Sequence, residues 1–474
     1  MPLSTRRDGW SGRAAHRRSL WHSLTPPQLF VASFVALVVL GTLGLKLLPG
    51  LYTGVPLGWI DALFTATSAV CVTGLVVVDT ATYFTTAGQA FLLLLIQLGG
   101  LGMIAFTTVI ILALGRRLSL RHERLSSASA EVAPHVPVNR LTRDIVLFTV
   151  GIETLGALAL YGLWAPHLGL GAAAWPALFH AVSAFCNAGF STFSDSLVGF
   201  QTSGGTLVVV GALIVAGGIG FLTMEELVLW RRTTRARHMF RLSLHSRLVL
   251  ATTAVLLAGG WLLFALFEWE GTLAHLRGAD RVINAFFLSV TPRTAGFNSI
   301  DYANATDSTN FLTIILMFIG GSPGSTAGGL KTTTFALIGL VAWERFRGRE
   351  IPSLWARSVP EETIQRAIGL AVVVFAVVTG SIFLYTWTEH TGPAGLAAGS
   401  NRFLALMFEG VSAFNTVGLS MGVTATLSDA GKWLTVLLMF VGRVGPLTFA
   451  AALAIAAERQ DVAYRHAYED VVVG

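Results

Sequence analysis

Charged residues are scarce in this sequence. Only 12% of its 474 residues are Asp, Glu, Lys or Arg, roughly half the share of an ordinary soluble domain, and 53% are hydrophobic. Several apolar runs reach the length of about 20 residues that crosses a bilayer. The sequence therefore predicts a polytopic membrane protein whose apolar spans lie in membrane lipid.

Cysteine is almost absent as well. The two cysteines, Cys71 and Cys186, each lie three residues before a glycine, in segments that we expect to be buried. We therefore expect no disulfide framework and interpret both as small buried side chains. We also expect no cleavable signal peptide, since the Arg-rich start is followed by an apolar run long enough to span the membrane and stay there.

The excess of positive charge has a topological explanation. A formal net charge of +6 would by itself suit a nucleic-acid partner. The basic residues, however, gather at the N-terminus and in three loops between apolar runs, where they set the orientation in the membrane. The loop clusters are Arg116, Arg117, Arg121, Arg124, Arg140 and Arg143; Arg231, Arg232, Arg235, Arg237, Arg241 and Arg247; and Arg345, Arg347, Arg349 and Arg357. We therefore expect no nucleic-acid partner and predict that both termini are cytoplasmic.

One short pattern occurs four times along the chain. Its copies are 67–75, 182–190, 290–297 and 411–419, and each ends in a glycine followed by a bulky apolar residue. The glycines are separated by 115, 107 and 122 residues, so a unit of about that size repeats. The third copy is the most diverged, yet it keeps this ending.

Each copy has the same hydropathy context of a span, a shorter apolar segment and a second span. The predicted spans are 29–48 and 88–114, 144–164 and 206–230, 248–267 and 311–341, and 364–387 and 433–457; the short segments are 61–70, 174–185, 282–290 and 402–412. This order predicts an all-α membrane protein with eight transmembrane helices and four re-entrant pore helices. The four pseudo-repeats of helix, pore loop and helix surround a central ion pathway.

These patterns divide the chain as follows. We predict a basic cytoplasmic N-terminus at 1–27, repeats at 28–115, 140–235, 245–345 and 362–458, and a cytoplasmic C-terminus at 459–474. The side opposite the basic loops carries Asp79, Asp195, Asp301 and Asp429, one after each repeat glycine. They either form an acidic mouth that concentrates cations or are ordinary solvated loop carboxylates and helix caps.

Re-entrant segments restrict what the glycines can do. Non-helical backbone at membrane depth must be buried or line a water-filled path, because lipid cannot satisfy its polar groups. Glycine permits backbone geometry that aims carbonyl oxygens at the axis, and such oxygens replace the hydration shell of a cation. The negative ends of the four half-helix dipoles would also be directed at the cation path.

On these motifs the sequence resembles the Trk/Ktr/HKT superfamily of potassium transporters, over essentially the whole chain after the basic N-terminus. The resemblance implies a potassium-binding filter at Val72, Thr73 and Gly74; Asn187, Ala188 and Gly189; Thr294, Ala295 and Gly296; and Thr416, Val417 and Gly418. Glycine at all four filter positions favours potassium. The residues before each glycine differ between copies, so the filter chemistry must come from the main chain.

A second glycine motif follows each filter. It lies at 99–102, 217–220, 320–324 and 442–446, where glycines allow close packing or a helix break. The third copy extends over 320–331 with five glycines and a proline, which cannot remain a regular helix and predicts an unwound intramembrane loop. It is not a nucleotide-binding P-loop, because the spacing to Lys331 is wrong and no strand precedes it.

The resemblance implies that this loop is a gate. The gate residues would be Gly320, Gly321, Ser322, Pro323, Gly324, Ser325, Thr326, Ala327, Gly328, Gly329, Lys331 and Arg443. Arg443 stands in an apolar span, where a charge is costly and indicates function. It resembles the family's arginine below the filter, a positive barrier and a partner for the loop. Lys331 is either a second such charge or a residue at the cytoplasmic boundary.

The loop and the span count are most like those of the Ktr group. This implies a homodimer in the bacterial plasma (inner) membrane, gated by a separate cytosolic nucleotide-binding ring of the KtrA type, with sodium dependence. Potassium is the expected transported ion, with sodium as a second candidate and no organic cofactor in this chain. The alternative is a related sodium carrier or proton-coupled potassium carrier; few carboxylates lie in the spans, Glu153, Glu225 and Glu226 excepted.

A membrane enzyme is not expected. It would need a convergent acid–base or metal cluster within the spans, and the eleven histidines have no paired ligand spacing. His180, in the second short segment, is the only histidine in a suggestive place, and we interpret it as a helix-packing residue.

Overall fold

The computed structural model describes residues 26–102, 138–235, 242–348, 353–355, 357–389 and 402–445. Helices dominate this part of the chain. Its strands are limited to β1 (Ser353–Leu354) and β2 (Arg357–Ser358), a two-residue antiparallel pair in which Ser353 lies opposite Ser358. The predicted all-α class is therefore confirmed.

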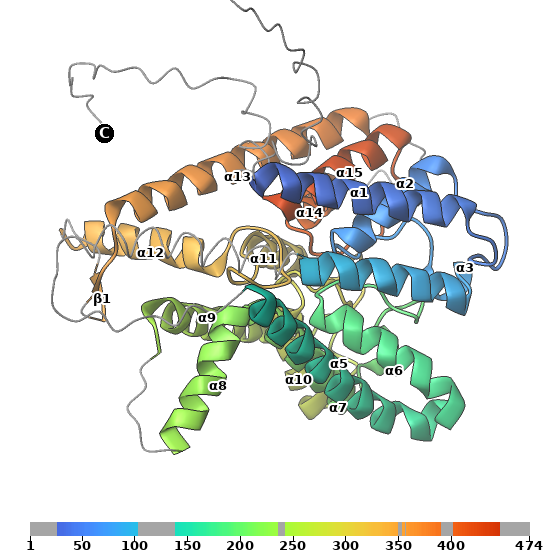
Figure 1. Ribbon diagram of the computed structural model, residues 1–474, viewed down its shortest axis with the longest axis horizontal. Coiled ribbons are helices and arrows are strands. Elements are labelled where there is room, and N and C mark those ends of the chain that lie inside the picture. The colour runs from blue at the N-terminus through green and yellow to red at the C-terminus, as the bar shows by residue number, and fades with distance from the viewer. Residues whose placement is uncertain are drawn as a thin grey trace, which may run out of the picture.

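The helices fall into four consecutive sets, one around each repeat glycine. The first set is α1 (Pro26–Leu47), α2 (Trp59–Val70), α3 (Thr80–Tyr83) and the helix Thr86–Gly102; the second is α5 (Val138–Leu168), α6 (Leu170–Phe185), η2 (Val198–Phe200), α7 (Gly204–Ile219) and α8 (Phe221–Arg235). The third is α9 (Leu244–Glu268), α10 (Gly278–Val290), α11 (Asp307–Phe318) and α12 (Thr332–Phe346); the fourth is α13 (Glu361–Thr388), α14 (Arg402–Phe414), η3 (Thr424–Thr426) and α15 (Asp429–Val444). Figure 1 shows these sets around the centre of the molecule, with the first beside the fourth.

The first helix of each set is long and apolar enough to cross a membrane. The segments Gln28–Leu47, Arg143–Leu168, Leu244–Glu268 and Glu361–Thr388 meet this criterion, and α7 with α8 makes a fifth if the bent pair is one span. Their surfaces expose large apolar side chains, for example Leu262 at 70% and Phe383 at 74%. Such a surface suits lipid, in which these helices lie as part of a multi-pass membrane protein.

Two of the predicted second spans are not continuous helices. The segment predicted at 206–230 bends by 102° between α7 and α8, at Gly220, whose φ of +91° ends α7. The segment predicted at 311–341 is interrupted between α11 and α12. The second break coincides with the unwound loop predicted at 320–331, whereas at 217–220 the glycines had left close packing and a helix break as alternatives. The predicted ends of two other spans, 103–114 and 446–457, lie outside the described residues, as do the N-terminus and the C-terminal 459–474.

The short helices α2, α6, α10 and α14 form the centre of the molecule. Each packs against the first helix of its own set, and cross-set contacts join α2 to α15, α7 to α10 and α11 to α14. Their C-terminal halves are buried, so these four helices end inside the protein. An ion pair between Lys432 of α15 and Asp61 of α2, at 2.7 Å, joins the fourth set to the first.

Candidate functional site: a ring of four glycine turns

All four glycine motifs adopt the same backbone turn. Two residues before each glycine, a residue other than glycine has a left-handed φ: Val72 (+55°), Asn187 (+59°), Thr294 (+67°) and Thr416 (+51°). The glycines themselves have φ of +94° (Gly74), +70° (Gly189), +76° (Gly296) and +94° (Gly418). Left-handed residues other than glycine are uncommon and concentrate at functional sites. The third copy, diverged in sequence, therefore keeps the backbone of the other three.

The four turns meet in a closed ring, which we call the glycine ring. A side chain added at Gly74 would overlap the Ala188 carbonyl, and its Cβ would lie 3.0 Å from the Gly189 Cα. The same relation leads from Gly189 to Ala295, from Gly296 to Val417, and from Gly418 back to Thr73. The four turns follow one another in sequence order around an axis, so the second lies opposite the fourth. Only glycine fits such a close approach of backbones.

Hydroxyl groups brace each turn from behind. Ser68 Oγ accepts a hydrogen bond from the Gly74 N–H at 3.1 Å, and Ser412 Oγ accepts one from the Gly418 N–H at 3.1 Å. In the other two turns the hydroxyl donates to the carbonyl that follows the glycine: Ser183 to Phe190 at 2.8 Å and Thr291 to Phe297 at 2.7 Å. The sequence reasoning did not assign this bracing role, although the serines are part of the repeated pattern.

The predicted filter side chains are buried in the protein. Val72, Thr73, Asn187, Ala188, Thr294, Ala295, Thr416 and Val417 are each at most 1% exposed. Chemically different side chains thus occupy equivalent places while the backbone stays the same. The turns therefore resemble one another in their main-chain groups and not in their side chains.

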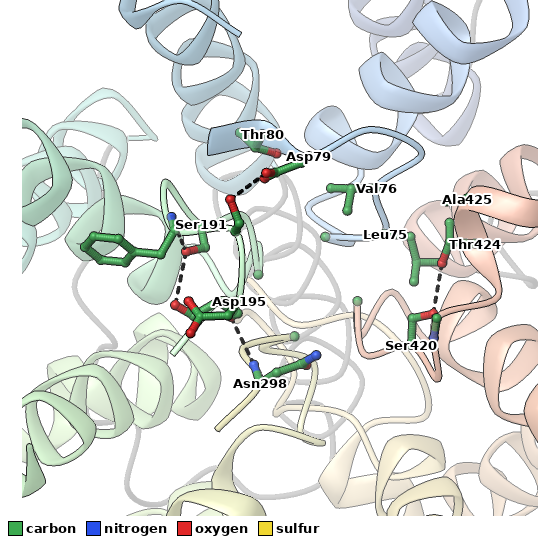
Figure 2. Close-up of a pocket in the computed structure, with 18 of the residues that line it drawn as sticks. Leu75, Val76, Asp79, Thr80, Ser191, Asp195, Asn298, Ser420, Thr424 and Ala425 are labelled. Carbon is green, nitrogen blue, oxygen red and sulfur yellow. Dashed lines mark hydrogen bonds between the residues drawn. The ribbon is translucent and has the colours of Figure 1, made fainter. Parts of the chain in front are cut away.

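A cavity of about 550 Å³ opens on one side of the ring, and all four ring glycines line it. Asp79, Asp195 and Asp301 line it too, so we call it the aspartate cavity. Figure 2 labels Asp79 and Asp195 there. Asp79 also caps α3 through the Ala81 N–H and accepts a hydrogen bond from Ser194 Oγ at 2.6 Å. Both interpretations of these carboxylates, acidic mouth and helix cap, thus apply to Asp79.

Asp429 does not share this position. It is the first residue of α15, where a carboxylate favours the positive end of the helix dipole, and it is not among the residues that line the aspartate cavity. Of the two alternatives that the sequence left open, Asp429 therefore fits the ordinary carboxylate at a helix end and not the acidic mouth.

The loop 320–331 lies on the side of the ring opposite the aspartate cavity. It contacts residues that precede the ring glycines: Thr326 Oγ1 donates to the Phe185 carbonyl at 3.2 Å, and a side chain at Gly328 would overlap Thr416 Oγ1. The Ser322 N–H donates to the Gly218 carbonyl at 2.9 Å. Most of the loop is buried. The predicted gate residues of this loop are thus in direct contact with the second and fourth turns.

Two positively charged side chains, Arg443 and Lys331, donate hydrogen bonds to carbonyl groups of the loop. Arg443 is 1% exposed; it donates to the Thr326 carbonyl and, at 3.4 Å, to the Gly99 carbonyl. Lys331 Nζ donates to the Ala327 carbonyl at 2.6 Å, so it folds back onto the loop. In the described residues Arg443 makes no ion pair with a carboxylate. It links the loop to the second helix of the first set.

The second helices approach the ring through their glycine motifs. A side chain at Gly99, Gly217 or Gly442 would overlap the carbonyl oxygen of the last residue of the short helix in the same set, which is Val70, Phe185 or Phe414. Gly320, the equivalent residue of the third set, instead faces the Gly328 carbonyl within the loop. The third set therefore differs from the others where the loop is inserted.

The remaining candidate residues are internal. Cys71 and Cys186 are free and buried, and Cys186 Sγ lies 3.5 Å from Gln97 Oε1. Glu153 accepts a hydrogen bond from Gln97 Nε2 at 3.2 Å. The described residues contain no group of three His, Cys, Asp or Glu side chains that could hold a metal ion. Sequence reasoning missed Arg293, a 6% exposed cation in the third turn that donates to Thr253 Oγ1 at 3.3 Å.

Apolar spanning helices around a four-turn ring define a multi-pass membrane transport protein. Residues 17–463 match the model of the TrkH family, described as cation transport protein, and the chain belongs to this family. It is 38% identical to the potassium/sodium uptake protein NtpJ of Enterococcus hirae over 452 residues, which cover 95% of this chain and 98% of that protein.

Two further comparisons agree with this assignment. The chain is 38% identical to the Ktr system potassium uptake protein B of Bacillus subtilis over 436 residues, 92% of this chain and 94% of that one. The expected resemblance to the Ktr group is therefore confirmed. The crystal structure of the potassium transporter TrkH from Vibrio parahaemolyticus has the same fold, with a TM-score of 0.71 and 18% identity over 91% of this chain and 86% of that chain.

Proposed function

We propose that this chain translocates potassium across the bacterial plasma membrane through the glycine ring. The observation that carries the proposal is the closed ring of four equal turns, in which each glycine lies against the carbonyl of the next turn. Rings of backbone carbonyls replace the hydration shell of a potassium ion. The names of the relatives NtpJ and Ktr system potassium uptake protein B favour the same ion.

The filter consists of the twelve residues 72–74, 187–189, 294–296 and 416–418. Because their side chains are buried and differ between turns, the main chain supplies the cation ligands. The short helices α2, α6, α10 and α14 end immediately before these turns, and the negative ends of their dipoles favour a cation there. The aspartate cavity is then the extracellular entrance, where Asp79, Asp195 and Asp301 raise the local cation concentration.

The loop 320–331 is the gate beneath this filter. Its contacts with Phe185 and Thr416 place it against two of the four turns, where it obstructs the path until it moves. Arg443 holds the loop by the Thr326 carbonyl and adds a positive barrier to cations. Lys331 adds a second positive charge beside it.

The loop is moved by a partner protein. The name of the B. subtilis relative places it in a Ktr system, which supports a multi-subunit assembly with a regulatory partner. We assign that role to a cytosolic nucleotide-binding ring of the KtrA type that docks on the Arg-rich loops. The membrane unit is a homodimer with both termini cytoplasmic, and its potassium uptake depends on sodium. Sodium transport is the second candidate function, favoured by the potassium/sodium uptake named for NtpJ.

The proposal is tested by potassium uptake in cells that lack their own potassium transporters. Cells express this chain or its Gly74→Ser variant, with and without sodium and with a KtrA-type regulator from a relative. A serine side chain at Gly74 overlaps the Ala188 carbonyl, so we expect the variant to lose potassium uptake or to shift toward sodium. Gly259→Ser, at an exposed position with no neighbour within 4 Å, is the matched control and should transport normally.

Each outcome is informative. Potassium uptake that needs sodium supports the sodium-dependent mechanism, and sodium uptake without potassium uptake supports the second candidate. Normal potassium preference in Gly74→Ser would overturn the filter assignment and leave the ring glycines as packing residues.

A further inference from the structure

The four short helices carry different residues at one equivalent position, nine residues before each ring glycine. The residues are Thr65, His180, Phe287 and Glu409, and all four are buried. Only the second and fourth helices carry a titratable group there. Because the second turn lies opposite the fourth in the glycine ring, His180 and Glu409 belong to opposed sides of the axis.

His180 fixes the orientation of a hydroxyl group at the cavity wall. Its Nδ1 lies 2.8 Å from the Pro176 carbonyl and its Nε2 lies 2.9 Å from Ser191 Oγ. A carbonyl only accepts, so in the neutral ring Nδ1 carries the hydrogen and Nε2 accepts. Ser191 therefore donates its hydrogen to His180; its other acceptor, the Ser196 carbonyl, is farther away at 3.5 Å.

Glu409 fixes the orientation of two hydroxyl groups on the opposite side of the ring axis. Its Oε2 accepts a hydrogen bond from Ser420 Oγ at 2.9 Å, and its Oε1 accepts one from Thr424 Oγ1. A carboxylate has no hydrogen to give, so both hydroxyl hydrogens point toward it. Glu409 itself is 0% exposed, so the protein encloses the carboxylate that orients them.

The two serines are equivalent. Ser191 and Ser420 each stand two residues after a ring glycine, and both line the aspartate cavity. Figure 2 shows them on opposite sides of that cavity. Each oxygen already accepts one backbone N–H, from Phe193 to Ser191 at 2.9 Å and from Gly422 to Ser420 at 3.0 Å. With its hydrogen turned into the protein, each oxygen keeps one further lone pair as a hydrogen-bond acceptor. The water molecules around a cation direct their hydrogens outward, so acceptors on two sides suit a hydrated cation.

We propose that His180 and Glu409 are positioning residues that hold Ser191 and Ser420 as two opposed acceptors for the water shell of a monovalent cation entering the glycine ring. This site at the mouth captures the cation before the ring carbonyls replace its water. The inference rests on the proposed function of the ring as a potassium filter.

The test separates the apparent KM for potassium uptake from the maximal rate per transporter. Ser191→Ala and Ser420→Ala remove one acceptor each, and we expect each to raise KM about three- to tenfold, the equivalent of one hydrogen bond. In Glu409→Gln the side-chain amide donates a hydrogen bond to one of the two hydroxyl groups, so that hydroxyl turns its hydrogen elsewhere. In His180→Phe the acceptor Nε2 is lost. Both variants should raise KM to a similar extent. The maximal rate should stay within about twofold, whereas a merely structural role would lower the amount of active protein and leave KM unchanged.

Two comparisons make the test specific. Thr65→Val, at the equivalent position of the first helix, where the hydroxyl has no hydrogen-bond partner among the described residues, should leave KM unchanged. Glu409→Gln combined with Ser420→Ala should be no worse than Ser420→Ala alone, because both act through one hydroxyl. Unchanged KM in both serine variants, or fully additive effects, would overturn the inference. If Gly74→Ser still alters ion preference in that case, the proposed function stands and only the site at the mouth is rejected.

Discussion

Single residues show how the glycine ring is stabilised without identical side chains. Each turn has a buried hydroxyl behind it, but the hydroxyl accepts from the glycine N–H in two turns and donates to a carbonyl in the other two. In the third turn the hydroxyl belongs to Thr291, five residues before the glycine, instead of six as for Ser68. A bracing hydroxyl therefore recurs in all four turns, while the direction of its hydrogen bond differs and its place in the sequence shifts in the third turn.

This difference explains what sequence could predict at the ring. The four glycines were located because each glycine and the apolar residue after it keep a fixed place in every copy. The partner of each hydroxyl was not predicted, since the residue pattern does not give which main-chain group of the folded turn lies nearest to the hydroxyl. Arg293 was missed because the corresponding residues of the other copies, Cys71, Cys186 and Asn415, are uncharged.

Removing one brace should loosen one quadrant of the ring. Ser68→Ala leaves the Gly74 N–H without its hydroxyl partner, and an unpaired buried N–H costs about 1–3 kcal/mol. We expect a lower ratio of rubidium to sodium uptake with normal protein levels. Ser33→Ala is the control, because within the described residues Ser33 donates to the Phe30 carbonyl of its own helix and not to the ring. An unchanged ratio would mean that the turn keeps its shape without Ser68.

Among the helical elements, hydropathy predicted the short helices well and the second spans less well. All four short helices exist within a few residues of their predicted bounds, because each is a compact apolar segment between polar loops. The second spans were predicted less well. Gly220 ends α7 through its positive φ, although apolar residues flank it on both sides, and the loop 320–331 separates α11 from α12. The loop itself was predicted from its five glycines, but its contacts with Phe185 and Thr416 required the structure.

Releasing the loop should open the gate. Arg443→Gln removes the charged donor to the Thr326 and Gly99 carbonyls, and each such hydrogen bond contributes about 1.5–3 kcal/mol. We expect uptake without the regulatory partner to rise roughly three- to tenfold, measured as initial rubidium uptake per transporter. Arg366→Gln, an exposed substitution on α13, is the control. Lower uptake in Arg443→Gln would show that Arg443 keeps the path open instead of closing it.

The whole molecule is held together between its first and last repeats. The Lys432–Asp61 ion pair joins α15 to α2, and the two side chains are 15% and 29% exposed, which reduces screening by water. Packing of α15 against α1 and α2 adds further contact at this junction of the first and fourth sets, which we call the seam. The sequence predicted four repeats around an axis, but this particular pair was not predictable because no repeat pattern relates Lys432 to Asp61.

The coupling energy of the Lys432–Asp61 ion pair can be measured by a double-mutant cycle. We expect Asp61→Asn and Lys432→Met each to lower the midpoint of thermal unfolding in detergent, and the double variant to lose less than their sum, with a coupling energy of about 1 kcal/mol. The exposed pair Glu362 and Arg366 on α13 provides a matched cycle in which no coupling is expected. Additive effects at Lys432 and Asp61 would mean that the ion pair does not stabilise the seam.

The closed ring also has a consequence for biosynthesis. Gly418 completes the ring against Thr73 and Gly74, although the ribosome makes these two parts of the chain far apart in time. The first three quadrants must therefore wait in the membrane, with an open side, until the fourth has been inserted. A nascent chain that stops before α14 lacks the fourth turn, so it cannot close the ring.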